Sequence, residues 1–192
     1  WAAKARKLVS VRMLYRYLVN KTRQLKINPA ADIEAPKPRK ALPKFLSLEE
    51  SLSLLDAVKN DTESKNVERD YAIITLFLNC GMRVSELVGI NLNDLQRDMT
   101  SLRVTGKGAK ERMIYLNDAC RAALSDYLPL RMKEEAAFDK PQKALFLSSR
   151  KNRISVKTVQ WMVYKYLDDA GLGGRHLSVH KLRHTAATLM LQ

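Results

Sequence analysis

Apolar residues near the start of the chain recur every three or four positions, which is the spacing of one face of an α-helix. Leu8, Val11, Tyr15 and Leu18 follow this spacing, and basic residues occupy the other face. We therefore predict one amphipathic helix over residues 3–26. A single helix cannot bury such a stripe alone, so this one is expected either to close a small helical module or to pack on another molecule.

A proline-rich stretch separates this helix from the rest of the chain. Asn28-Pro29 is expected to end the helical region, and residues 35–43 hold three further prolines. Prolines at this density favour an extended, semi-rigid linker. The domain limits that we predict are residues 1–33 for the helical piece, 34–45 for the linker and 46–192 for the main domain.

The main domain is predicted to begin at a helix-capping motif, Ser47 followed by Glu50. Beyond it, segments of helical periodicity enclose one pair of short strands, joined by the glycine-rich segment 106–110 as a hairpin tip. The predicted helices run from the cap through Val58, over 67–80 with Gly81 as the end, over 84–89, from Asn117 to Leu128 with Pro129 as an interruption, over 155–170 and over 179–192. The predicted strands cover 101–105, 112–116 and 145–148. The fold class is mainly α with a small antiparallel β-sheet.

The composition of the chain is that of a folded protein. Its 192 residues are 46% hydrophobic and 28% charged, with 7 Gly and 6 Pro, which excludes disordered and fibrous classes. No apolar run is long enough to span a bilayer and no secretion signal opens the chain, so we expect a cytoplasmic protein without a membrane partner. Cys80 and Cys120 fit neither a disulfide framework nor a metal-ligand spacing, so we expect two reduced core thiols.

The net charge of the chain and its distribution are more informative about function than the composition. The chain has 34 Lys and Arg against 20 Asp and Glu, a net charge of +14. Residues 1–46 hold twelve basic and two acidic residues. Such an arm is attracted to a polyanion through counterion release. An anionic membrane would attract it too, but the apolar residues form a narrow seam, so nucleic acid is favoured.

Several catalytic motifs are missing from the sequence. It has no glycine-rich nucleotide-binding loop, no His-Glu-x-x-His and no carboxylate cluster that would hold two magnesium ions. We therefore disfavour a metal-dependent nuclease and expect neither a metal nor another cofactor. The remaining candidates are cationic or imidazole groups at special positions. These are Arg83 after a helix-ending glycine, Lys107 at the hairpin tip, and His180 with Arg183 on the last helix.

Each candidate also has an ordinary structural interpretation. Arg83 and Glu86, three positions apart, can form a common surface ion pair, and Lys107 can be a solvated turn residue. His180 and Arg183 lie on one helical face, where an imidazole can transfer a proton and a guanidinium can bind phosphate oxygens. The two other histidines are predicted to be structural or exposed. His176 lies in the glycine-rich loop. His184 could share in the phosphate chemistry, but we place it on the turned-away side of the helix as a hydrogen-bonded structural residue.

Three motifs in this order resemble those of the tyrosine recombinase (phage integrase) family, most of all its Xer-like bacterial members. They are Gly-Met-Arg-Val-Ser-Glu-Leu at 81–87, Gly-Lys-Gly-Ala-Lys-Glu-Arg at 106–112 and His-Lys-Leu-Arg-His-Thr-Ala-Ala-Thr at 180–188. The resemblance implies that Arg83 and Arg183 bind the scissile phosphate, that Lys107 is the hairpin lysine and that His180 is the general acid/base. Glu86 matches a supporting acidic position. Residues 1–33 resemble the end of the family's helical core-binding domain.

The resemblance further implies a site-specific DNA recombinase that acts by metal-free transesterification through a 3′-phosphotyrosine. The expected partners are double-stranded DNA and other recombinase subunits in a DNA-bound tetramer. The family places its nucleophilic tyrosine beyond the His-x-x-Arg motif, whereas all seven tyrosines here precede that motif. We therefore expect a fragment without the nucleophile, inactive in strand cleavage. The alternatives are a non-catalytic DNA-binding relative or regulator and, less favoured, a type IB topoisomerase-like enzyme.

A wider set of residues is predicted to contact DNA through phosphates or base edges. Some belong to the basic arm and linker, some to the hairpin, and some to the polar start of the helix predicted at 155–170. The candidates are Lys7, Arg12, Arg16, Arg39, Lys40, Lys110, Arg112, Lys157, Thr158 and Gln160.

Overall fold

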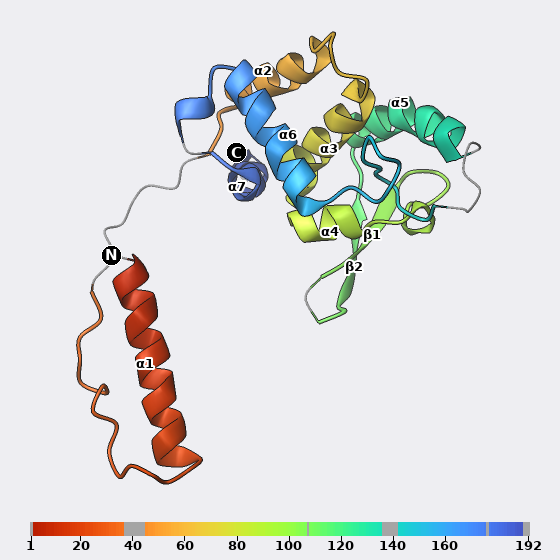
Figure 1. Cartoon of the computed structure of the whole chain (residues 1–192). Helices are drawn as coiled ribbons and strands as arrows, with labels where there is room; N and C mark the ends of the chain where they lie inside the picture. The colour runs from red at the N-terminus through yellow and green to blue at the C-terminus, as the bar shows by residue number, and fades with distance from the viewer. Residues whose placement is uncertain (1, 37–44, 107, 136–141, 176, 190–192) are drawn as a thin grey trace. The chain divides into compact units, whose positions relative to one another are not determined.

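The computed structural model describes residues 2–36, 45–106, 108–135, 142–175 and 177–189. The chain divides into two compact units, Trp1–Pro43 and Lys44–Gln192. Figure 1 shows the helix of the first unit and the helices and hairpin of the second. In the described part of the chain, no helix combines the length and the apolar character that crossing a membrane requires.

The first unit consists of helix α1 (Ala2–Asn20) and the chain that follows it. The helix ends at Asn20 and not at residue 26 as predicted, because the chain reverses there: Arg23 adopts a left-handed φ of 54°. The returning segment is fastened to the helix by side chains. Arg12 Nε donates to the carbonyl oxygen of Ala30 at 2.9 Å, and Asn28 Nδ2 donates to that of Arg12 at 3.3 Å.

The second unit is built around helix α3 (Val67–Cys80), which packs against α2 (Leu48–Lys59) and two later helices, α5 (Asp118–Glu135) and α7 (Val179–Leu189). Both predicted helix signals are confirmed. Ser47 Oγ accepts the N–H of Glu50 at 3.1 Å while the Glu50 carboxylate accepts the N–H of Ser47 at 2.8 Å. Gly81 ends α3 with a φ of 55°, a conformation that side chains disfavour.

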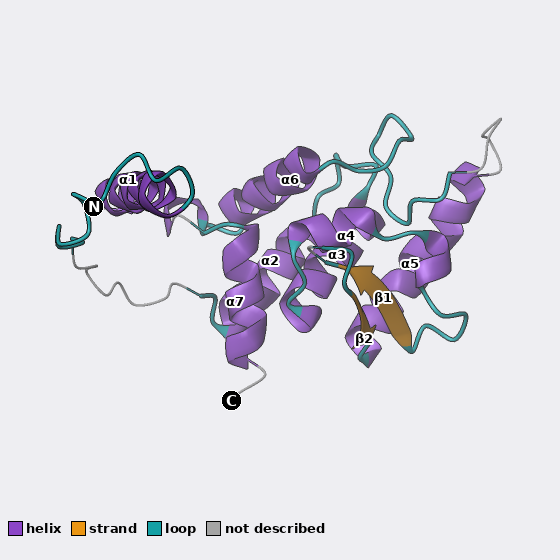
Figure 2. Ribbon diagram, turned by 90° about the horizontal axis from the view of Figure 1, so that it is seen from below, coloured by secondary structure: helices purple, strands orange, loops and turns teal. Residues whose placement is uncertain are grey.

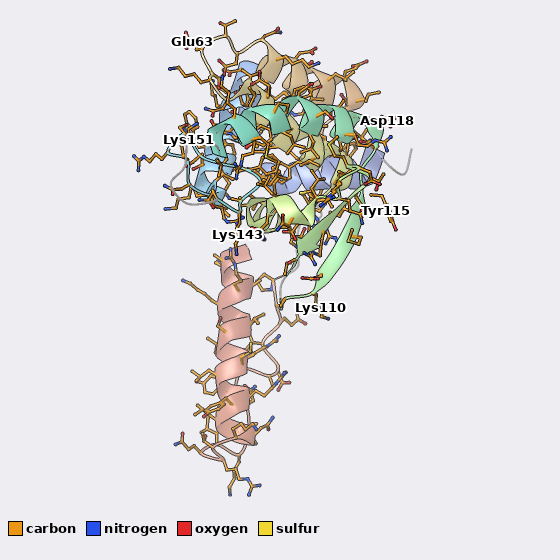
Figure 3. The ribbon with its side chains drawn as sticks, turned by 90° about the vertical axis from the view of Figure 1, so that its right-hand side faces the viewer. Glu63, Lys110, Tyr115, Asp118, Lys143 and Lys151 are labelled. Carbon is orange, nitrogen blue, oxygen red and sulfur yellow. The ribbon has the colours of Figure 1, made fainter. Side chains whose placement is uncertain are left out.

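A two-stranded antiparallel sheet projects from this unit. Strands β1 (Ser101–Thr105) and β2 (Glu111–Tyr115) pair from Ser101 opposite Tyr115 to Thr105 opposite Glu111. The second strand lies one residue earlier than predicted. Figure 2 shows the sheet beside α4 (Val84–Gly89), and Figure 3 shows Lys110 near the end of the hairpin that points away from the helices of this second unit. The mainly helical fold with a small antiparallel sheet is confirmed.

Helix α5 (Asp118–Glu135) corrects the prediction of an end at Leu128. Asn117 caps it as predicted, since its Oδ1 accepts the N–H of Cys120 at 3.0 Å. Pro129 lies inside the helix, where it cannot donate a backbone hydrogen bond. Tertiary contacts on both sides of it hold the helix: Tyr127 Oη donates to the carbonyl oxygen of Leu145 at 3.0 Å, and the buried Arg131 donates to that of Ala144.

The strand predicted at 145–148 does not form. This segment and the residue before it instead make isolated bridges, Leu147 with Arg153 and Ala144 with Asn91, and neither bridge belongs to the sheet. The 3₁₀ turn η1 (Leu92–Asp94) precedes the hairpin. Cys80 and Cys120 are free thiols whose sulfur atoms lie 3.7 Å apart.

Helices α6 (Val156–Asp169) and α7 (Val179–Leu189) complete the fold, with the 3₁₀ turn η2 (Gly173–Arg175) between them. The predicted end of the last helix, residues 190–192, lies outside the described residues. The start of the unit is tied to α7, because the buried N–H of Leu46 donates to Thr185 Oγ1 at 2.9 Å.

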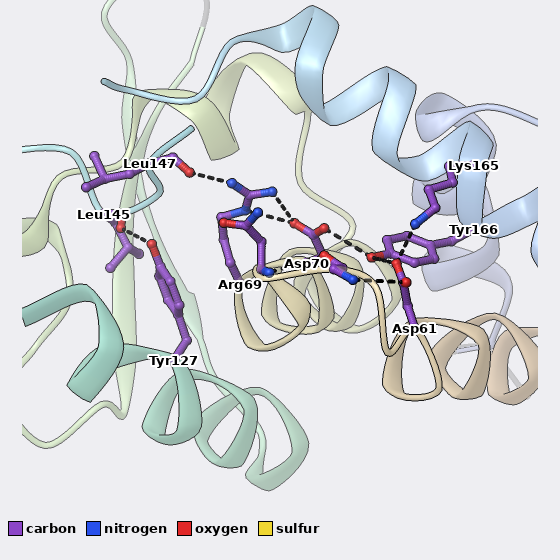
Figure 4. Close-up of polar contacts among 10 residues, drawn as sticks. Asp61, Arg69, Asp70, Tyr127, Leu145, Leu147, Lys165 and Tyr166 are labelled. Carbon is purple, nitrogen blue, oxygen red and sulfur yellow. Dashed lines mark hydrogen bonds and ion pairs between the residues drawn. The ribbon is translucent and has the colours of Figure 1, made fainter. Parts of the chain in front are cut away.

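A buried polar network fixes α6 against α3 and the loop before it (Figure 4). Tyr166 Oη on α6 lies 3.0 Å from Asp61 Oδ2 and 3.2 Å from Asp70 Oδ2, and Arg69 pairs with Asp70 at 2.7 Å. Burial raises the pKa of Asp70, although the neighbouring Arg69 acts in the opposite direction. The network satisfies groups that would otherwise be costly to bury.

Candidate active site

The site is organised by one buried carboxylate, that of Glu86 on α4. Its side chain is only 1% exposed, and it accepts four hydrogen bonds from two arginines. Oε1 accepts Arg83 Nη1 at 2.8 Å and Arg112 Nη1 at 3.0 Å. Oε2 accepts the backbone N–H of Arg83 at 2.7 Å and Arg112 Nη2 at 3.1 Å. From the sequence, Arg83 and Glu86 could have been a common surface ion pair. In the structure the Glu86 carboxylate of this pair is buried and acts as an anchor for the site.

The environment of Glu86 keeps it ionised. Burial alone raises the pKa of this carboxyl, but the hydrogen bonds from Arg83 and the charge of Arg112 outweigh burial, and the pKa lies below its ordinary value. A carboxylate that is charged and fully paired in this way holds its partners in fixed positions.

Two backbone contacts at glycines bring the elements of the site together. A β-carbon on Gly81 would lie 3.5 Å from the Cβ of Ala186, so the turn between α3 and α4 lies directly on α7. A β-carbon on Gly106 would lie 3.4 Å from Glu86 Oε1, so the end of β1 lies against the carboxylate. The turn, the hairpin and α7 therefore meet at these two positions.

A cleft of about 370 Å³ lies between the start of α4 and helices α6 and α7. Arg83, His180 and Arg183 line it together, with Gln160 and Tyr164 of α6 on another side. The side chain of Arg83 is 54% exposed and that of Arg183 is 31% exposed, so both side chains are partly accessible from solvent. The structure thus brings together three of the residues that the motifs singled out.

Arg183 is held differently from Arg83. Its Nη1 lies 4.0 Å from Glu86 Oε2, which is an ion pair without a hydrogen bond. This nitrogen is buried and has no hydrogen-bond partner within the described residues. Buried donors are normally satisfied, so the Arg183 guanidinium retains capacity for an anionic oxygen.

His184 corrects the prediction of a turned-away structural residue. Its Nε2 lies 3.2 Å from His180 Nε2, and the two rings meet edge to face with centroids 4.7 Å apart. Residues four apart on a helix share a face, so His180, Arg183 and His184 form one cationic and imidazole surface on α7. The spacing alone was sufficient to predict this. Tyr164 in the cleft is a second feature that the sequence did not single out.

The predicted DNA contacts fall into three groups. Lys7, Arg16, Lys110 and Lys157 are exposed, and Gln160 is an exposed residue of the cleft. The second group has partners within the chain. Arg12 donates to backbone carbonyls after α1, and Arg112 binds Glu86. Thr158 is hydrogen-bonded to the capping residue Ser155. The third group lies outside the described residues and consists of Arg39 and Lys40. The same holds for Lys107 and His176.

Comparison with known proteins gives relatives of one kind. The chain is 55% identical over 188 residues to the tyrosine recombinase XerC of Caldanaerobacter subterraneus subsp. tengcongensis, covering 98% of this chain and 51% of that protein. It is 38% identical over 191 residues to XerC of Thermodesulfovibrio yellowstonii, covering 97% of this chain and 62% of that protein. The chain therefore spans about half to two thirds of the length of these curated relatives.

Solved structures agree on the fold. The crystal structure of XerA recombinase matches with a TM-score of 0.68 at 27% identity, over 96% of this chain and 69% of that one. The Tn1549 transposon integrase, solved in complex with circular intermediate DNA, matches with a TM-score of 0.74 at 19% identity, over 97% and 65% of the two chains. A family model described as the phage integrase family matches residues 44–192. With its cleft lined by residues of the first and third motifs and its sequence matched over this range, the chain belongs to the phage integrase family.

Proposed function

We propose that this chain is the phosphate-binding and proton-transfer part of a site-specific DNA recombinase, which cleaves and rejoins strands through a 3′-phosphotyrosine intermediate. The observation that carries the proposal is the convergence of Arg83, His180 and Arg183 on one cleft around buried Glu86. Membership of the phage integrase family and the XerC relatives support it.

In the proposed step, a tyrosine oxygen attacks a DNA phosphorus, a P–O bond to tyrosine forms and the P–O5′ bond breaks. The phenol loses a proton and the departing 5′ oxygen gains one. His180 in the cleft is suited to proton transfer, and Lys107 is the proposed donor at the hairpin tip. A 5′-hydroxyl from another strand reverses the step, so the bond energy is conserved.

The arginines supply the electrostatic part of the step. A phosphodiester carries one negative charge, and attack on phosphorus adds charge to its non-bridging oxygens. Three guanidinium groups surround the single carboxylate of Glu86, which leaves an excess of positive charge at the cleft. Preorganised donors of this kind stabilise developing charge without reorganising during the reaction.

We propose double-stranded DNA as the substrate and further recombinase subunits in a tetramer as partners. A solved relative, XerH, was crystallised bound to its difH substrate. The nucleophilic tyrosine is proposed to lie outside the 192 residues, and residues 1–33 to form the end of a core-binding domain, with 34–45 as the linker and 46–192 as the catalytic domain. The exposed Lys7, Arg16, Lys110 and Lys157 are proposed DNA contacts.

The test compares the 192-residue chain with the product of its complete gene. Each is incubated with a nicked duplex that traps the covalent intermediate, and denaturing gels then separate covalent adducts from free DNA. We expect an adduct from the complete protein alone, with duplex binding by both. Arg183→Ala in the complete protein should abolish the adduct, since loss of one oxyanion contact costs about 100-fold to 1,000-fold in rate.

Two outcomes would contradict the proposal. Binding without any adduct from the complete protein would identify a non-catalytic DNA-binding relative. An adduct formed by the 192-residue chain itself would show that one of its own tyrosines is the nucleophile, and Tyr164→Phe would then be the first variant to examine because Tyr164 lines the cleft.

A further inference from the structure

Arg112 of β2 does not line the cleft, yet it makes the only paired contact to Glu86 in which both guanidinium Nη atoms take part, as far as the structure describes the chain. Its Nη1 and Nη2 bind the two carboxylate oxygens side by side, at 3.0 and 3.1 Å. Such a two-pronged contact fixes both the position and the plane of a carboxylate, which a single bond does not.

From this geometry we infer that Arg112 is a positioning residue, which acts through Glu86 to keep the guanidinium groups of Arg83 and Arg183 directed at the phosphate. The inference rests on the proposed function, because it assigns Arg112 a part in the same phosphate site.

The acceptor positions of Glu86 are shared between two arginines. Arg112 occupies one acceptor position on each oxygen, and Arg83 occupies another on each. Arg183 Nη1 remains 4.0 Å from Oε2, beyond hydrogen-bond distance. If Arg112 is removed, Oε2 loses a charge-assisted bond, and the closest unsatisfied guanidinium nitrogen is that of Arg183. Arg183 is then expected to turn towards the carboxylate and away from a bound phosphate.

Arg112 also connects the hairpin to the site. It follows the hairpin tip in sequence, and Gly106 at the other side of the tip lies against the same carboxylate. The N–H of Gly106 donates to the carbonyl oxygen of Lys110 at 2.7 Å, which closes the turn. The chain on both sides of the hairpin tip therefore contacts Glu86, which also binds Arg83.

The hairpin offers a matched control in Arg103 of β1. Arg103 is 47% exposed and Arg112 is 42% exposed, and both pair with a carboxylate. Arg103 binds Asp94 of the turn η1, however, and makes no contact with Glu86 within the described residues. Arg103→Met thus removes the same charge from the same hairpin without disturbing the carboxylate of the site.

The experiment uses the complete gene product and measures two quantities separately. The first is the dissociation constant for the duplex and its dependence on salt. The second is the rate of covalent adduct formation with DNA at saturation. For Arg112→Met we expect a rate about 100-fold lower, the effect of a misplacement of about 1 Å, with affinity and salt slope unchanged. Arg103→Met should leave the rate unchanged. Arg112→Lys should recover part of the rate, because lysine retains the charge but not the paired contact.

A double variant distinguishes action through Glu86 from independent action. If Arg112 works through the carboxylate, Glu86→Gln combined with Arg112→Met should be no slower than the slower single variant. Multiplying effects would overturn the inference. So would a normal rate for Arg112→Met together with a salt slope smaller by about 0.9, which is the signature of a lost direct phosphate contact.

A measurement on the 192-residue chain separates failure of this inference from failure of the proposed function. Inorganic phosphate serves as the probe, and its binding is followed by NMR through the ring signals of His180. We expect Arg112→Met to weaken phosphate binding at least about fivefold, a fraction of the loss of a charge-assisted contact, and Arg103→Met to leave it unchanged. If the complete protein makes no adduct but this difference holds, the function is wrong and the positioning role stands. Equal phosphate binding by the two variants would refute the positioning role.

Discussion

The substitution Glu86→Gln removes one negative charge at the centre of the site and leaves the side-chain volume almost unchanged. Its effect on stability can be worked out from the hydrogen bonds that Glu86 accepts. Each oxygen of Glu86 accepts two N–H donors. A glutamine amide has one oxygen and one NH₂ group, so in either orientation two of the four bonds become donor-to-donor contacts. Two charge-assisted bonds set an upper limit of about 3–6 kcal/mol. Because Arg83 and Arg112 are half exposed and regain water, we expect a loss of about 2–4 kcal/mol in the free energy of unfolding.

Urea unfolding of the 192-residue chain measures this loss, and thermal unfolding should show a midpoint lower by about 5–15 °C for a domain of this size. The variant also removes the one negative charge among three guanidinium groups, so duplex affinity should rise or stay constant while adduct formation by the complete protein falls. Glu111→Gln is the control, since Glu111 is exposed and meets Arg103 at 3.8 Å. Unchanged stability of Glu86→Gln, or a loss equal to that of Glu111→Gln, would refute the buried-anchor argument.

Three further predictions concern acid, backbone and sequence preference. The pKa of Glu86 is lower in the folded than in the unfolded chain. The ionised carboxylate therefore stabilises the fold at pH values above the unfolded pKa, and this stabilisation is lost as the pH falls through the folded pKa. The free energy of unfolding, measured as a function of pH, should show this loss for the wild type and not for Glu86→Gln. Gly81→Ala should lower the free energy of unfolding by about 1 kcal/mol or more, because φ there is 55°, and an unchanged urea midpoint would contradict this. Gln160→Ala should alter the preference among duplex sequences, whereas Lys157→Ala should weaken binding to all of them alike in the same competition assay.

Local signals were sufficient for much of the fold. The Ser47 capping box, the left-handed Gly81 and the glycine-rich hairpin each specify structure within a few residues, and all three appear as predicted. Prediction from local sequence failed where contacts with residues distant in the sequence determine the structure. Pro129 was expected to end a helix, but the contacts of Tyr127 and Arg131 with residues 142–145 hold the turn on either side of it.

The candidate site shows the same division. The three motifs indicated Arg83, His180 and Arg183, and the structure places these residues in one cleft. The role of Arg112 was not predictable, because its partner lies 26 positions away and no periodicity connects them. The position of His184 was predictable from helix geometry: four residues correspond to slightly more than one turn, so it shares the face of His180.

The hydrogen bond between Leu46 and Thr185 determines where mechanical load enters the main unit. Leu46 lies near the start of the second unit, and this residue is fastened to α7, the helix that carries His180 and Arg183. Tension on the chain before Leu46 therefore reaches α7 through this hydrogen bond, and it reaches α2 along the backbone. A force applied there acts on the helix that carries two residues of the cleft, whereas Arg83 and Glu86 belong to a different element, α4 and its cap.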